Sequence, residues 1–99
     1  MNALQKKTQQ IFSLNLDCVK KKLMKPKVEL GSAWSEKKVE KVEKQYKAFL
    51  VVCYTERGCT PTRDIDIFWH MHILFTQKYH EDCENIFGRY LHHFPVCDT

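Results

Sequence analysis

Apolar residues recur at intervals of three and four along most of this chain, which is typical of helices that bury one face. Within residues 3–24 no Pro or Gly interrupts the pattern, and its apolar members are Phe12, Leu16, Val19 and Leu23. The spacing predicts one amphipathic helix over 3–24, stopped by Pro26 and followed by a connector.

A second helix is predicted to begin after Ser35, whose side chain can cap it, and to end at Gly58 in a left-handed cap. The apolar seam of this helix consists of Val39, Val42, Tyr46, Phe49 and Cys53. Two oppositely charged pairs at i,i+4 spacing are expected on its outer, solvated face: Glu40 with Lys44, and Glu43 with Lys47.

A third helix is expected from the Thr62 cap to about Phe87, with Gly88 as its stop. The chain then divides into a lysine-rich N-terminal helix and connector (1–34), the second helix (35–58), and a histidine- and aromatic-rich helix with its tail (61–95). We therefore predict an all-α fold, a compact three-helix bundle, or a four-helix bundle if the tail adds a turn.

Composition agrees with a small helical domain. The chain has 99 residues, 43% of them hydrophobic, with only three Gly and three Pro to build hairpins. Residues 1–50 carry 12 Lys and 5 acidic side chains, whereas residues 51–99 carry 4 basic and 7 acidic ones. Because the N-terminal basic residues are all Lys rather than Arg, we expect a solvated face or a partner with an acidic surface, and not nucleic acid.

Five cysteines without a C-x-x-C pair are typical of thiols in a reducing compartment. A bridge between Cys53 and Cys59 is the less favoured alternative. No signal peptide and no membrane span are evident, so a cytoplasmic or other reducing location is expected. The oligomeric state is not predicted.

All five histidines lie within residues 64–95. On one unbroken helix, His72, Thr76, Tyr79 and Cys83 share the face that must meet the other helices. We predict that these side chains form a buried polar network, with His72 and Thr76 in reach of each other.

His70 lies on another side of the same helix, about 200° from His72. Asp66 precedes it by four residues, and the tail histidines could fold back toward this pair. The alternative hypothesis is therefore a zinc or iron site, or a metal-dependent enzyme, that uses Asp66, His70, His92 and His93. A catalytic dyad of Cys83 and His80 is a weaker hypothesis, because no third orienting group is evident.

An apolar strip on the third helix is expected to face away from the core. It consists of Ile67, Met71 and Leu74. Exposed apolar strips often mark partner surfaces. Together with Lys41 and Lys44 of the second helix, this strip is the predicted partner-binding surface.

The second half of the chain resembles a small family that is similar to the domain of plant glycine-rich domain proteins. The resemblance begins near Tyr46, and its positions are Pro61, Asp66, Trp69, His70, His72, Thr76, Tyr79, Asp82, Cys83, Phe87, Gly88, His92, His93 and Pro95. It implies a helical structure but no reaction. Residues 1–34 lie outside it.

The preferred hypothesis is a non-catalytic helical module that acts through protein–protein contacts, as a regulator, inhibitor or adaptor of a larger protein.

Overall fold

The computed structural model describes residues 2–25, 33–56 and 60–93 of the chain. These residues form helices and no strand, which confirms the all-α class. Five helices follow one another: α1 (Ala3–Phe12), α2 (Asp17–Met24), α3 (Glu36–Thr55), α4 (Arg63–Leu74) and α5 (Thr76–Phe87). The helices predicted over 3–24 and from Thr62 to Phe87 are each divided in two. The predicted number of three or four helices is therefore too low.

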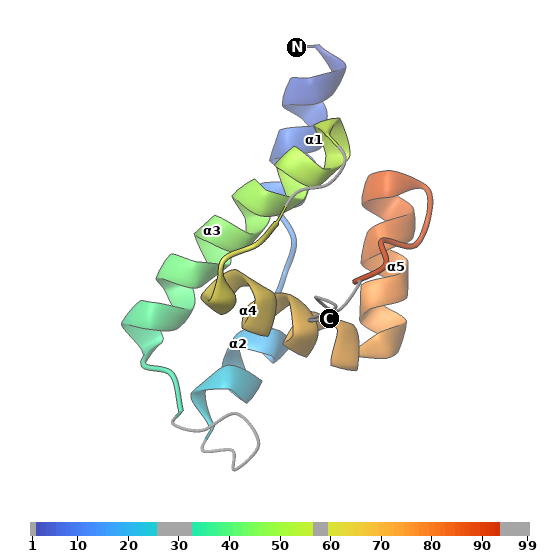
Figure 1. The fold of residues 1–99 in the computed structure, drawn as a ribbon. Helices are drawn as coiled ribbons and strands as arrows, with labels where there is room; N and C mark the ends of the chain where they lie inside the picture. Colours follow the sequence, from blue (N-terminus) through green and yellow to red (C-terminus); the bar gives the residue numbers. More distant parts are fainter. Residues whose placement is uncertain (1, 26–32, 57–59, 94–99) are drawn as a thin grey trace, which may run out of the picture.

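The longest helix, α3, organises the fold. It packs against α1, α2 and α4, while α5 packs against α4 and α1 (Figure 1). The predicted α3 seam is confirmed for Val39, Val42, Tyr46 and Phe49, which are buried, whereas Cys53 is half-buried. The Ser35 side chain accepts a hydrogen bond from the Lys38 amide, as a cap should. The predicted Gly58 cap lies outside the described residues.

The predicted helix over 3–24 is wrong, because the chain turns at Ser13–Leu16. Lys47 of α3 stabilises this turn. Its ammonium donates hydrogen bonds to the carbonyls of Phe12 (3.1 Å) and Leu14 (2.9 Å), which a continuous helix would have bonded internally. Phe12, placed on the buried face by its spacing, is 44% exposed.

Lys47 also corrects the predicted outer face of α3. Its ion pair with Glu43 is present at 3.2 Å between Nζ and Oε2, yet Lys47 is only 7% exposed. Because Lys47 also bonds the carbonyl of Phe12 at the end of α1 and Glu43 pairs with Lys20 of α2, the pair faces α1 and α2 and not the solvated side.

The single helix predicted from Thr62 to Phe87 is also wrong, because Phe75, with φ −85° and ψ 72°, separates α4 from α5. Both of its predicted ends are confirmed: the Thr62 side chain accepts from the Ile65 amide, and Gly88 closes α5 with a φ of 70°. We call the turn at Phe75 the elbow.

The predicted exposed strip on α4 does not exist as a unit. Met71 is 3% exposed and belongs to the core, and Ile67 is half-buried against it. Leu74, beside the elbow, is 58% exposed. Within the described residues, every helix is too short or too polar to span a membrane.

Candidate functional site

The elbow brings together side chains that a straight helix would hold apart. Ten residues of straight helix span about 15 Å, yet two pairs at that separation are hydrogen-bonded across the α4–α5 turn. His72 Nε2 lies 2.8 Å from Asp82 Oδ2, and Trp69 Nε1 lies 2.8 Å from the Tyr79 hydroxyl. The two pairs lie against each other, because the His72 and Tyr79 rings meet edge to face at 4.8 Å.

Tyr46 connects this cluster to α3. Its hydroxyl lies 2.7 Å from His72 Nδ1, and both side chains are almost fully buried, at 0% and 1% exposed. On the other side, Tyr79 donates to the carbonyl of Leu91 and thereby fixes the segment after Gly88. We call Tyr46, Trp69, His72, Tyr79 and Asp82 the buried network.

The protonation states in the buried network follow from its geometry. Burial lowers the pKa of His72, despite the opposing hydrogen bond to Asp82, so the imidazole is neutral. Burial alone would raise the pKa of Asp82, but hydrogen bonds from His72 and Lys78 outweigh it and hold the pKa below its ordinary value. Hence the Nε2 hydrogen of His72 points to the Asp82 carboxylate.

The Nδ1 atom of His72 then accepts from the hydroxyl of Tyr46. Burial raises the pKa of Tyr46 well above its ordinary value, so that hydroxyl keeps its proton. In the described segments, no buried side-chain nitrogen or oxygen is left without a hydrogen-bond partner. The polar groups of this cluster therefore satisfy one another, which is the arrangement of a structural core.

The predicted polar network is partly reproduced. His72, Tyr79 and Cys83 are buried, but Thr76 is exposed at the start of α5 and does not take part. His72 instead contacts Tyr46 and Asp82, neither of which was assigned to the network. Tyr46 had one signal in the sequence: it is a hydroxyl-bearing residue in an apolar seam.

The predicted metal ligands are only partly brought together. Asp66 Oδ1 is hydrogen-bonded to Nε2 of His93, whose ring lies 4.4 Å from that of Trp69 between centroids. His70 is exposed, on another side of α4 from buried His72. Across residues 2–25, 33–56 and 60–93, no three His, Cys, Asp or Glu side chains are grouped as a metal site would require.

The Cys83 and His80 dyad finds no support in the geometry. Cys83 is 3% exposed, and burial raises the pKa of its thiol, which keeps the unreactive protonated form. His80 faces solvent beside Glu84, with its Nε2 atom 4.0 Å from Glu84 Oε1.

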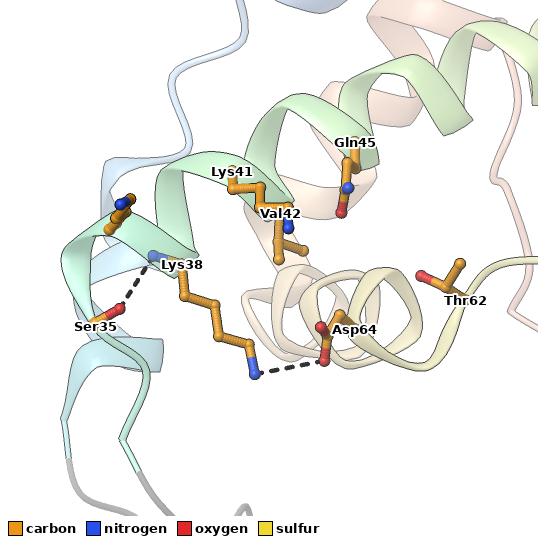
Figure 2. Close-up of a pocket in the computed structure, with 8 residues that line it drawn as sticks. Ser35, Lys38, Lys41, Val42, Gln45, Thr62 and Asp64 are labelled. Atoms are coloured by element: carbon orange, nitrogen blue, oxygen red, sulfur yellow. Dashed lines mark hydrogen bonds and ion pairs between the residues drawn. The ribbon is translucent and has the colours of Figure 1, made fainter.

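A groove lies where the N-terminal half of α3 passes the start of α4. It has a volume of about 520 Å³ and is lined by Ser35, Lys37, Lys38, Lys41, Val42, Gln45, Thr62 and Asp64. Figure 2 shows Lys38 extending from α3 toward Asp64 on α4, where Nζ and Oδ1 are 3.6 Å apart. We call this feature the lysine groove. Sequence reasoning singled out Lys41 but not the α4 side of the groove.

Comparison with known proteins places the chain in a family. A curated Arabidopsis thaliana protein, "Glycine-rich domain-containing protein 2", is 38% identical over 55 residues, which are 50% of this chain and 7% of that protein. The chain therefore spans a small part of the length of this relative. No solved structure matches the chain significantly.

A family model described as UCP032817-like matches residues 6–97. The match extends well beyond the predicted resemblance, because it includes most of the lysine-rich region of residues 1–34. Most of α1 and all of α2 are thus part of the family domain, and the chain belongs to the UCP032817-like family.

Proposed function

We propose that this domain is a non-catalytic helical module that binds an acidic segment of a partner protein through the lysine-rich side of α3. In this role it acts as a regulator, inhibitor or adaptor of that partner. The observation that carries the proposal is the lysine groove, in which three lysines stand against a single aspartate.

The state of the motif residues supports a binding role over catalysis. An active site needs polar groups that are accessible to substrate. His72 and Tyr46 are buried and occupied by each other, and the Cys83 thiol is buried and protonated. The lysine groove instead presents the ammonium groups of Lys37, Lys38 and Lys41, which attract and orient anions without reacting with them.

Lysine composition favours a protein partner over nucleic acid. The groove contains no arginine, the residue whose planar guanidinium binds phosphate through two hydrogen bonds. Ammonium groups are compact point charges, and they bind carboxylates without a fixed geometry. An acidic protein segment is therefore the partner whose chemistry the groove fits best.

The test is a binding titration with a glutamate-rich peptide, followed by NMR of the ¹⁵N-labelled protein. We expect shift changes on the side of α3 that carries Lys37, Lys38, Lys41 and Lys44. Reversing the charge of Lys41 and Lys44 together to Glu should abolish the changes.

The control replaces Lys6 and Lys21, which are exposed on α1 and α2, with Glu. This double substitution lowers the net charge by the same amount. That variant should bind like the native domain. Equal loss in both double variants would mean that only net charge attracts the peptide, and it would contradict the proposal.

A further inference from the structure

The lysine groove has the size of a ligand site. Its volume of about 520 Å³ lies within the range of roughly 300–1,000 Å³ that is usual for such sites. Residues of α3 and α4 form most of its lining, together with the capping residues Ser35 and Thr62 that precede the two helices. None of its lining residues belongs to the buried network.

Charge determines which ligand fits. Lys37, Lys38 and Lys41 present three positive charges, and Asp64 is the acidic residue among the lining side chains. Lys38 and Asp64 are 43% and 46% exposed at a separation of 3.6 Å, so water screens their attraction. A carboxylate from a ligand can replace Asp64 as the partner of Lys38 at little cost.

The groove also offers a small apolar surface. Val42 is the apolar residue among its lining side chains, and beside the groove the Lys38 ammonium lies 4.6 Å from the centroid of the Trp34 ring. The methylene stems of the lysines add to this surface, because long side chains keep apolar stems beneath their charged ends. Figure 2 shows Lys41 and Gln45 on α3 above the first turn of α4, with Val42 between the two helices.

We infer that the lysine groove holds a peptide segment that carries both acidic and apolar residues, and that Lys38 exchanges Asp64 for a carboxylate of the peptide. This inference rests on the proposed function and narrows it from a face of α3 to one groove. Asp64 then acts as an internal competitor, which occupies Lys38 until the ligand arrives.

The experiment measures fluorescence anisotropy of a labelled octapeptide of alternating Glu and Leu, at low salt. Lys41→Ala should weaken binding about 3- to 10-fold, while Lys44→Ala, on the same helix but outside the groove, should change it less than about 2-fold. Circular dichroism shows that both variants stay folded.

Asp64→Asn is the more specific test, because removing the carboxylate that competes for Lys38 should strengthen peptide binding. We expect a gain of about 2- to 5-fold, the range of one exposed ion pair. The control, Glu40→Gln, removes the same charge from the exposed surface of α3 outside the groove and should change binding less.

Three results would overturn the inference. In the first, Lys41→Ala and Lys44→Ala weaken binding equally, and Asp64→Asn changes the peptide affinity by the same factor as Glu40→Gln. The exposed face of α3 then binds the peptide but the groove does not, so the inference fails while the proposed function stands. If the peptide does not bind at all, the proposed function fails as well. If an oligo-dT strand displaces the peptide at equal concentration, the occupant is a nucleic acid.

Discussion

The bond between Tyr46 and His72 can be removed almost without changing shape. In Tyr46→Phe the ring stays in place and only the hydroxyl is lost. The Nδ1 atom of His72 then has no donor, and with His72 only 1% exposed water cannot replace it. A buried acceptor without its partner costs about 1–3 kcal/mol.

This cost should be visible in both chemical and thermal unfolding. A change of 1–3 kcal/mol in a domain of about 100 residues lowers Tm by about 5–15 °C. Urea titrations followed by circular dichroism should show a lower midpoint with the same slope, because the surface exposed on unfolding is unchanged.

Tyr54→Phe is the matched control. Tyr54 lies on the same helix and is 41% exposed, so water solvates its position and the change should stay within about 0.5 kcal/mol. If Tyr46→Phe unfolds at the same urea concentration as Tyr54→Phe, the buried network does not stabilise the fold as described.

Three further predictions follow from burial and charge. Because the pKa of buried His72 lies below its ordinary value of 6.5, the unfolded chain takes up a proton more readily than the folded one. The free energy of unfolding should therefore fall as the pH drops below about 6.5, and it should fall less steeply in His72→Gln than in His80→Gln. The same dependence on pH in both variants would contradict this prediction. Met71→Ala should lower the free energy of unfolding in urea titrations by about 2–5 kcal/mol, whereas Leu74→Ala should change it by less than about 0.5 kcal/mol. Equal losses would contradict the burial of Met71. Lys47→Met should cost about 2–4 kcal/mol and speed hydrogen exchange at the α1–α2 turn, whereas Lys44→Met should do neither.

Local signals predicted most helix ends correctly. The Ser35 and Thr62 side chains accept hydrogen bonds in the first turns of α3 and α4, and Gly88 closes α5. These features depend on a few neighbouring residues, which a sequence displays directly. Spacing also predicted most of the buried face of α3, although it placed buried Lys47 on the outer face.

The two helix breaks lack the strongest local signals, because neither Ser13–Leu16 nor Phe75 contains a Gly or Pro. The first break had a weaker signal in Ser13 and Asn15, since such side chains favour turns, and Asn15 accepts a hydrogen bond from the Asp17 amide. The first break is stabilised by Lys47, 33 residues away from Leu14. The second allows the hydrogen bonds of His72 with Asp82 and of Trp69 with Tyr79. Tertiary contacts therefore override helix propensity at Phe75, and they support a local turn signal at Ser13–Leu16.

The elbow also explains why the sequence did not predict the partners of His72. On a straight helix His72 meets Thr76, one turn along, and Asp82 lies out of reach. Once the chain folds at Phe75, the partner of His72 changes to Asp82 and Thr76 moves to the surface. One backbone turn thus reassigns the network, although His72 itself was correctly placed inside.

Stability and binding should separate in this domain, since the buried network and the lysine groove share no residue. At a temperature where it is fully folded, Tyr46→Phe should bind the Glu–Leu peptide with native affinity, whereas Lys41→Ala should unfold at the native urea midpoint and bind weakly. Distant sites without common partners act independently to within about 0.5 kcal/mol, so the double variant should show the sum of both effects. A folded Tyr46→Phe domain that binds as poorly as Lys41→Ala would mean that the His72 cluster takes part in recognition.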